Sequence, residues 1–337
     1  MATPRETKQP VQPGDHETTS FAGQDAVIPF QVSPLDIRGR AVQLGPLLDS
    51  ILQRHDYPEP VSRMLAEAIT LTTLLGSALK FEGKFIMQTK TDGVVPLIVT
   101  EFRTPQDVRA YASFDRDEVE AAIEKGCTST PELLGDGILA MTIDQGEYTQ
   151  RYQGIVKLEG ISLEEVARTY FRQSEQIPTE VRLAVGQTMT RMDDGSVTHG
   201  WTGGGLLVQF LPDSEERMRQ KDLHGGEGAD EHNFQIDDSW AEAQALMGTV
   251  TELELSDSTV EPERLLFRLF HEHGVRVFEP LNVFDACGCS EETVRGVLNG
   301  FTPEQIAEST EENGISVTCE FCSKTYNFSP AEFVTSQ

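Results

Sequence analysis

The sequence predicts an α+β protein in three successive parts: a mixed N-terminal domain with an antiparallel sheet and helices, a helical linker, and a small C-terminal domain. Three observations support this division. Helical periodicity alternates with short β-branched runs over the first 210 or so residues, the composition turns acidic after Pro212, and four of the five cysteines lie within the last 51 residues. Helices and antiparallel strands within one segment are typical of an α+β domain.

Residues 1–22 are predicted to form a disordered tail, because they are rich in Pro and Thr and lack the apolar core of a secretory signal. The most apolar helical stretch, residues 64–81, is interrupted by Glu67 and several hydroxyl side chains, so it is expected to be a core helix and not a membrane span. We therefore expect a cytoplasmic protein whose N-terminal domain covers residues 23–212.

Within that domain, residues 40–81 show two helical patterns separated by Tyr-Pro-Glu-Pro, with Pro60 in a first helical turn. The period then changes to that of strands. Two β-branched runs at 84–102 surround Thr-Asp-Gly, which is a hairpin signal, and residues 108–114 add a third candidate strand.

The second half of the domain is predicted to hold four further strands, at residues 138–145, 148–156, 181–189 and 203–211. Between them, Ser162 and Glu165 form the pattern of a capping box. The helix expected after it carries an apolar stripe at Leu163, Val166 and Tyr170. The glycine-rich stretch at 201–205 lacks the Gly-Lys-Ser/Thr of a phosphate loop, so it is predicted to be a turn before the last strand.

Residues 213–282 are predicted to form an acidic and helical linker, since positions 213–263 hold fifteen acidic and three basic side chains. One helix is expected to begin near Asp238, with an apolar face made of Trp240, Ala243, Leu246, Met247 and Val250. The next is expected to begin at Pro262 and stop at Gly274, with an apolar face made of Leu265, Leu266, Leu269 and Phe270. Both faces need a cover. The C-terminal domain is expected to be a neighbour of these helices, and their apolar faces can also cover a surface of the N-terminal domain.

The C-terminal domain, residues 283–337, is predicted to contain two short helices, a turn and an alternating segment. One helix follows Ser290, the second has a capping box between Thr302 and Gln305, and an alternating strand pattern follows Gly314. The apolar content is low for a unit of about 50 residues, so the domain needs an additional staple.

Two cysteine pairs can supply that staple, because 29 residues separate the Cys-x-Cys and Cys-x-x-Cys motifs and no histidine lies in or between them. Zinc takes four soft ligands in a tetrahedron at about 2.3 Å each. The sequence therefore predicts one zinc ion per chain, held by Cys287, Cys289, Cys319 and Cys322. A thioredoxin-like dithiol at Cys319 and Cys322 is the main alternative, although its usual βαβ setting is lacking. The fifth cysteine, Cys127, is expected to be a loop or packing thiol without a role.

The close spacing within each pair also permits redox chemistry, because neighbouring thiols can form local disulfides. Such short disulfide loops replace little of the long-range constraint that zinc provides, so oxidation is expected to release the metal and unfold the C-terminal domain. The apolar surface thus exposed, on a chain kept soluble by a formal charge of −28, would suit a binder of unfolded proteins. The same charge argues against nucleic acid or anionic membranes as partners.

Cys-Gly-Cys at 287–289 and Cys-Glu-Phe-Cys at 319–322 occur together with LLFRLFHEHGVRVFEP, YQGIVKLEG and YFRQSEQIPTEVRLAV. This combination resembles the heat-shock protein 33 family of redox-regulated chaperones, from about residue 23 onward. The resemblance implies an ATP-independent holdase, which is not an enzyme and is inactive while zinc is bound to the four reduced cysteines. Family members are activated by peroxide or hypochlorous acid.

By the same resemblance, activation forms the disulfides Cys287–Cys289 and Cys319–Cys322, with the second pair oxidised first. Zinc leaves, the linker unfolds, and a surface for unfolding or aggregation-prone clients is exposed, while the chain changes from a monomer to a homodimer. The tail of about 22 residues and an acidic, glycine-rich expansion near 213–236 depart from the family pattern. A thiol-disulfide oxidoreductase and a constitutive zinc-scaffolded interaction module are the alternative functions.

Overall fold

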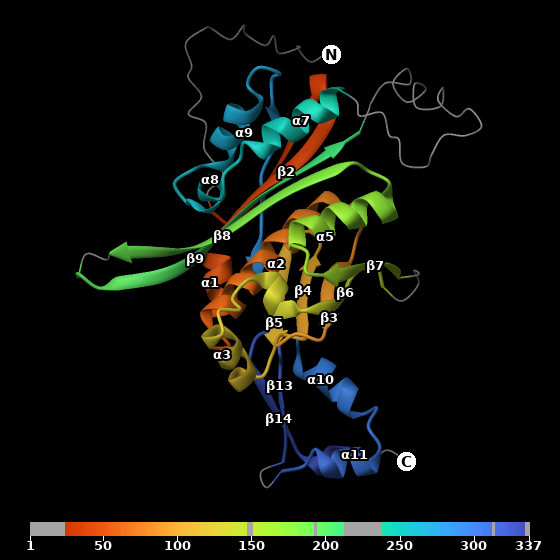
Figure 1. Cartoon of the computed structure of the whole chain (residues 1–337). Coiled ribbons are helices and arrows are strands. Elements are labelled where there is room, and N and C mark those ends of the chain that lie inside the picture. Colours follow the sequence, from red (N-terminus) through yellow and green to blue (C-terminus); the bar gives the residue numbers. More distant parts are fainter. Residues whose placement is uncertain (1–23, 147–150, 192–193, 212–237, 312–313, 334–337) are drawn as a thin grey trace, which may run out of the picture.

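The computed structural model describes residues 24–146, 151–191, 194–211, 238–311 and 314–333. Over these residues the chain forms two six-stranded sheets, one two-stranded sheet, and helices around and between them (Figure 1). The predicted α+β class is therefore confirmed. The tail predicted at 1–22 and the acidic, glycine-rich expansion predicted near 213–236 lie outside the described residues.

The first sheet joins the beginning and the end of the predicted N-terminal domain. Its strands run in the order β10-β1-β2-β9-β8, with β11 also paired to β1, and the described pairings are antiparallel. The strands are β1 (Ala26–Val32), β2 (Ile37–Leu44), β8 (Thr179–Arg191), β9 (Val197–Phe210), β10 (Arg276–Val277) and β11 (Leu281–Asn282). Because β10 and β11 follow the linker helices, the chain returns to this sheet before it reaches the cysteines.

The second sheet has the order β12-β5-β4-β3-β6-β7 and is antiparallel except for β12, which runs parallel to β5. Its strands are β3 (Lys84–Thr91), β4 (Leu97–Arg103), β5 (Asp107–Ser113), β6 (Asp136–Asp144), β7 (Tyr152–Glu159) and β12 (Phe284–Asp285). The hairpin predicted around Thr-Asp-Gly is confirmed as β3 and β4. The next three predicted strands correspond to β5, β6 and the described part of β7.

The central helix α2 (Glu59–Ala78) contacts strands of both sheets and is buried on nearly all sides (Figure 1). Gly76 lies against Phe102 of β4, and Leu74 lies against Gly205 of β9. Pro60 occupies the first turn, as the sequence predicts. Although α2 is long, no helix in the described part of the chain combines the length and the apolarity of a membrane span.

Residues 40–44 belong to β2 and not to the first predicted helix, and α1 (Pro46–Leu52) begins only at Pro46. β2 is hydrogen-bonded to β1 on one side and to β9 on the other, and the second half of the strand is buried on both faces. Strands covered on both faces lack the alternation of apolar and polar residues that identifies a strand from sequence. β1 is missing from the prediction for the same reason.

The strands predicted at 181–189 and 203–211 are confirmed as parts of β8 and β9. The turn predicted for the glycine-rich stretch is wrong, because β9 begins at Val197 and Gly203, Gly204 and Gly205 lie inside it. Both faces of the sheet are closely covered here. An added Cβ would meet side chains of α1, α2 and β8 at Gly203 and Gly205, and the backbone carbonyl of Leu255 in α8 (Glu252–Ser256) at Gly204. These glycines are thus needed for close packing of the helices on the sheet.

The helix predicted after Ser162 is confirmed as α5 (Leu163–Tyr170), which continues into a π-helical turn at Phe171–Glu175. Ser162 Oγ accepts a hydrogen bond from the Glu165 N–H at 3.3 Å. The predicted stripe is buried and comprises Leu163, Val166 and Tyr170. Two helices that the sequence does not predict, α3 (Arg116–Glu124) and α4 (Thr130–Leu134), flank the turn that contains Cys127. α3 fully buries only Val119, with Ile123 partly buried against the core, so its apolar face is short among many charged residues.

Three helices form a layer on the outer face of the first sheet, which we term the linker layer (Figure 1). They are α7 (Asp238–Gly248), α8 and α9 (Pro262–Phe270), so both predicted linker helices are confirmed. The layer lies at the opposite end of the molecule from the helices at residues 291–308, so the expectation that the C-terminal domain is its neighbour is wrong (Figure 1). The first sheet covers the apolar faces instead, and Phe270 stacks on Phe30 of β1 with 5.8 Å between ring centroids.

Residues 286–333, termed the C-terminal unit, contain α10 (Glu291–Leu298), α11 (Pro303–Glu308) and the hairpin of β13 (Ile315–Thr318) and β14 (Thr325–Phe328). A single 3-10 turn follows at Pro330–Glu332. The capping box predicted for the second helix is confirmed. The unit has a small core, made of Leu298, Ile306, Ile315, Tyr326 and Phe328. We term residues 24–211, which hold α1 to α5 and most of both large sheets, the N-terminal body.

Candidate metal centre

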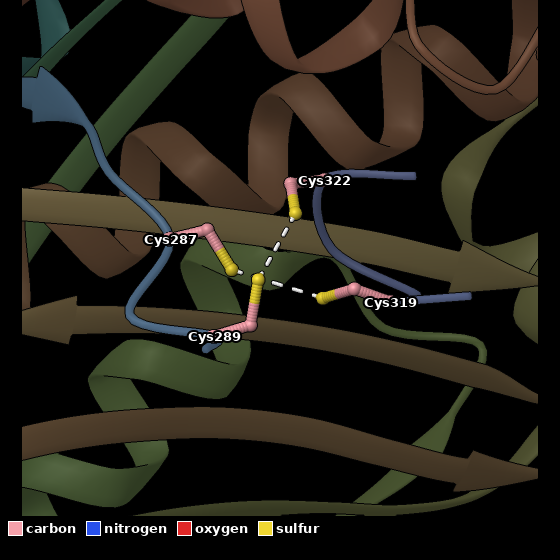
Figure 2. A group of neighbouring side chains, drawn as sticks. All are labelled: Cys287, Cys289, Cys319 and Cys322. Atoms are coloured by element: carbon pink, nitrogen blue, oxygen red, sulfur yellow. Dashed lines mark hydrogen bonds between the residues drawn. The ribbon is translucent and has the colours of Figure 1, made fainter. Parts of the chain in front are cut away.

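The four cysteine side chains of the C-terminal unit converge on one point (Figure 2), and their sulfur atoms all lie within 4.8 Å of one another. The Sγ atoms of Cys287 and Cys319 are 3.8 Å apart, and those of Cys289 and Cys322 are 3.3 Å apart. A disulfide bond is about 2.05 Å long, and the four cysteines are free thiols in this structure. The fold thus brings together both pairs that the sequence singles out.

The first pair is positioned by backbone pairing with the N-terminal body. β12 lies beside β5, and the Ala286 N–H donates to the carbonyl oxygen of Val108 at 3.0 Å, directly before Cys287. Directly after Cys289, the Ser290 side chain caps α10. The first pair is therefore confined between the edge of a sheet and the beginning of a helix.

The second pair is positioned by the turn of the β13–β14 hairpin. The Ser323 N–H donates to the Cys319 carbonyl at 2.8 Å, and the Cys319 N–H donates to the carbonyl of Lys324 at 3.0 Å. Ser323 adopts a positive φ of 57°, which closes the turn directly after Cys322. Because the turn is this tight, both thiols are directed toward the first pair.

The environment gives the thiols different proton affinities. Burial raises the pKa of Cys287 and raises that of Cys322 to about 12. Burial also disfavours the Cys289 thiolate, but hydrogen bonds from the Tyr326 hydroxyl and from the other thiols outweigh it and lower the pKa of Cys289 to about 7. The same hydrogen bond to Cys289 raises the pKa of Tyr326 to about 12.

The separations between the sulfurs suit a single tetrahedral metal ion. With metal–sulfur bonds of about 2.3 Å, ligand sulfurs in a tetrahedron are separated by roughly 3.8 Å. The two separations given above, 3.3 and 3.8 Å, are close to this value. Among the described residues, no other group of three or more His, Cys, Asp or Glu side chains lies close enough together to hold a metal ion. The four thiols therefore fit a metal ion.

Sequence reasoning missed two neighbours of the sulfurs. The Tyr326 hydroxyl lies 3.2 Å from Cys289 Sγ, and its position four residues after Cys322 is the one signal that could have identified it. Arg109 Nη1 lies 3.7 Å from Cys287 Sγ, although the two residues are 178 positions apart. The fold alone brings this cation to the thiols.

Comparison with known proteins gives consistent results. The chain matches the family described as "Hsp33 protein" over residues 25–329. It is 43% identical over 311 residues to a "33 kDa chaperonin" of Caulobacter vibrioides, and the alignment covers 91% of this chain and 95% of that protein. It is 33% identical over 306 residues to a protein of the same name from Pseudomonas aeruginosa, with 90% and 91% covered.

The overall fold is similar to that of a solved structure, described as the crystal structure of a 33 kDa chaperonin (heat shock protein 33 homolog) from Thermotoga maritima. The TM-score is 0.67 at 20% sequence identity, and the match covers 92% of this chain and 97% of the other. The relatives named above are chaperones, not enzymes. The chain therefore belongs to the Hsp33 family.

Proposed function

We propose that this protein is a redox-regulated, ATP-independent holdase chaperone that is inactive in its reduced, zinc-bound form. The observation that carries the proposal is the convergence of four free thiols in a unit with a very small core. Membership of the Hsp33 family supports the chaperone activity, and the thiol cluster supports its control by oxidation. Its partners are unfolding or aggregation-prone proteins in the cytoplasm, and neither nucleic acid nor a membrane.

Reduced Cys287, Cys289, Cys319 and Cys322 would hold one Zn²⁺ per chain as thiolates, because four soft sulfur ligands favour zinc. Bound zinc would cross-link two segments that are 29 residues apart in the sequence. Structural zinc sites contribute on the order of 10 kcal/mol to folding. With five side chains in its described core, the C-terminal unit would depend on this contribution.

Oxidation would remove the cross-link. In each pair, two thiolates give two electrons to one peroxide molecule and form one disulfide bond, while the peroxide takes up two protons and leaves as two water molecules. The products are the disulfides Cys287–Cys289 and Cys319–Cys322. Their sulfurs are no longer thiolates and cannot retain zinc. The disulfides close loops of three and four residues, so they do not restore the connection between the pairs.

Unfolding of the C-terminal unit would loosen the linker layer through the segment that joins them. β10 and β11, which follow the linker helices, each pair over only two residues, so few backbone hydrogen bonds hold this segment to the first sheet. The linker layer buries Met247, Leu266 and Phe270 against the first sheet. Its release would expose apolar surface on both sides, as the binding of unfolded chains requires.

The proposal includes the assembly state and the division of the chain. The reduced protein would be a monomer and the oxidised, active protein a homodimer. The functional parts would be residues 23–212, 213–282 and 283–337, with residues 1–22 as a tail, because the proposed switch acts on the last two parts and leaves the first intact.

Peroxide titration tests the proposal, with zinc release followed by a chromogenic chelator and client aggregation followed by light scattering. We expect about one zinc ion per chain to leave as antiaggregation activity appears, and a thiol reductant to reverse both. A zinc-scaffolded interaction module would lose binding when oxidised. A thiol-disulfide oxidoreductase would turn over a small disulfide substrate. Zinc loss without a gain of activity would contradict the proposal.

A further inference from the structure

One side chain within the second thiol pair contacts the N-terminal body. Phe321 lies between Cys319 and Cys322 in the sequence, and its ring packs against Arg109 and Tyr111 of β5. The ring centroid lies 4.9 Å from that of Tyr111 in an edge-on arrangement. The guanidinium carbon of Arg109 lies 4.0 Å from the Phe321 centroid, so the ring is also in cation–π contact.

The backbone of the same turn meets the end of α1. The Phe321 carbonyl oxygen lies 3.5 Å from Arg54 Nη1, and the Ser323 hydroxyl lies 3.4 Å from His55 Nδ1. Four side chains of the body thus contact the turn that carries Phe321, and we term them the Phe321 socket: Arg54, His55, Arg109 and Tyr111. The first two directly follow α1 and the last two lie on β5, so the socket joins segments that are far apart in the sequence.

Arg109 connects the socket to the first thiol pair. Its Nη2 forms an ion pair with Glu101 Oε2 at 2.6 Å, and only 17% and 7% of the two side chains are exposed. Its Nη1 is directed at Cys287 Sγ, 3.7 Å away. One guanidinium group, fixed by a buried carboxylate, therefore contacts both Cys287 of the first pair and the Phe321 ring between the two cysteines of the second.

The two pairs are attached to the body in different ways. The first pair follows β12, whose backbone is hydrogen-bonded to β5, and Asp285 of β12 accepts a hydrogen bond from Ser50 at 2.6 Å and forms an ion pair with Arg54. These contacts do not involve the thiols. The second pair is attached through Phe321, whose position is set by the two cysteines beside it.

We propose, on the basis of the redox function proposed above, that Phe321 is a positioning residue that ties the second thiol pair to the N-terminal body. Docking in the socket holds Cys319 and Cys322 in the arrangement that binds metal. Oxidation of this pair releases Phe321 from the socket, while β12 keeps the first pair on β5.

Docking of Phe321 and binding of the metal both fix the same short turn. Each therefore favours the other, and loss of one weakens the other. A disulfide between Cys319 and Cys322 brings two sulfurs that lie within 4.8 Å of each other to about 2.05 Å and separates them from the first pair. The two electrons pass to peroxide, as in the balanced step above. The turn is then no longer joined to the first pair through the metal. Only the socket contacts still hold it, and they are too few to keep it on the body.

The variant Phe321→Ala removes the ring and leaves all four thiols in place. Phe301→Ala is the matched control, since Phe301 is an aromatic residue of the same unit that is 39% exposed. Phe321→Tyr keeps a ring against Arg109. Two quantities are measured on each full-length protein: hydrogen exchange of residues 318–324 in the reduced, zinc-loaded state, and the rate of zinc release after peroxide is added.

We expect Phe321→Ala to exchange faster over residues 318–324 and to release zinc about tenfold faster than the wild type, an effect between those of an exposed and a desolvated cation–π contact. Phe301→Ala and Phe321→Tyr should behave like the wild type. Equal exchange and equal zinc release in Phe321→Ala and the wild type would overturn the proposal. A purely structural role would predict the same loss for Phe301→Ala.

If Phe321→Ala fails to bind one zinc ion per chain, Tyr111→Ala tests the same contact from the body, outside the thiol unit. It should accelerate zinc release, and an unchanged rate would overturn the proposal. If the wild type releases zinc without gaining antiaggregation activity, the redox function fails, but the hydrogen exchange of the reduced protein still decides whether Phe321 docks.

Discussion

Among the described residues, the two large sheets with α2 between them enclose a cluster of 39 buried apolar side chains, whereas the core of the C-terminal unit contains five. A core of 39 side chains is sufficient for a domain that folds by burial of apolar surface alone, and a core of five is not. A reaction at the four thiols can therefore unfold one region and leave the other folded. The linker layer lies between these extremes, because its 18-residue cluster is shared with the first sheet.

This difference explains why the reactive groups are located where they are. Regions that open in response to a signal have low local stability, while their supports remain folded. The thiols lie in the region with the smallest core, and the surfaces that oxidation would uncover lie on the region with the largest. The predictions below test whether the two regions are as independent as their cores suggest.

Removal of the metal should have the largest effect. A strong chelator, or Cys289→Ser, should unfold the C-terminal unit, because structural zinc contributes on the order of 10 kcal/mol. Hydrogen exchange should become fast over residues 291–328 and stay slow in α2. Cys127→Ser, in the turn between α3 and α4, is the control and should change neither. Slow exchange in the metal-free C-terminal unit would contradict the comparison.

A cavity in the body should destabilise the body and leave zinc binding by the C-terminal unit unchanged. Phe102 is 1% exposed and packs on Gly76 of α2, so Phe102→Ala should lower the free energy of unfolding of the body by about 3–5 kcal/mol. Urea unfolding followed by far-ultraviolet circular dichroism measures this loss. Zinc affinity, measured by competition with a chelator, should remain unchanged. A parallel loss of zinc affinity would show that the two regions are not independent.

The linker layer can be displaced without touching either core. Gly204→Ala would place a Cβ against the Leu255 carbonyl of α8, which should cost about 1–3 kcal/mol and loosen α8 on the sheet. We expect faster hydrogen exchange in α7 to α9 and partial antiaggregation activity without oxidation. Gly248→Ala is the matched control, since an added Cβ there meets no atom within 4 Å. Equal activity in both variants would separate the linker layer from client binding.

The smallest effect concerns a carboxylate in the body. Burial raises the pKa of Glu67, which accepts a hydrogen bond from the Thr130 hydroxyl at 2.7 Å. A raised pKa in the folded state means that Glu67 favours folding below its unfolded pKa, and that this contribution is lost as the pH rises through the folded pKa. Glu67→Gln should therefore stabilise the body more at pH 8 than at pH 4.5, because the glutamine cannot ionise in the buried position.

Urea unfolding in the presence of a chelator measures this difference for the body alone. An advantage of Glu67→Gln that is equal at both pH values would contradict the assignment of the effect to ionisation. Zinc release from the zinc-loaded variant should match that of the wild type, because Glu67 lies on α2 and not in the C-terminal unit.

Features with local periodicity could be predicted from the sequence. The helices α7, α9 and α11 follow from apolar stripes and caps, and the thiol cluster follows from the spacing of the four cysteines. β1 and β2 could not be predicted, because strands buried on both faces lose their alternation. The glycines of β9 are required by α2 and α8, which pack against them only in the folded chain.

The surroundings of the cysteines were the least accessible to sequence reasoning. Arg109 reaches Cys287 across 178 positions, and Phe321 is recognisable as a docking residue only once Tyr111 is seen beside it. The location of the linker layer could not be predicted either, because an apolar helix face identifies a buried surface without identifying its partner. Contacts between distant segments depend on the topology of the two sheets.

The central claim is that oxidation of the four thiols unfolds the C-terminal unit and activates the protein while the N-terminal body stays folded. Hydrogen exchange before and after peroxide, on samples whose antiaggregation activity is measured in parallel, tests it most directly. We predict that activity rises together with loss of protection over residues 291–328, while α2 remains protected. Activity that rises with the C-terminal unit still protected, or protection lost throughout the chain, would contradict the account.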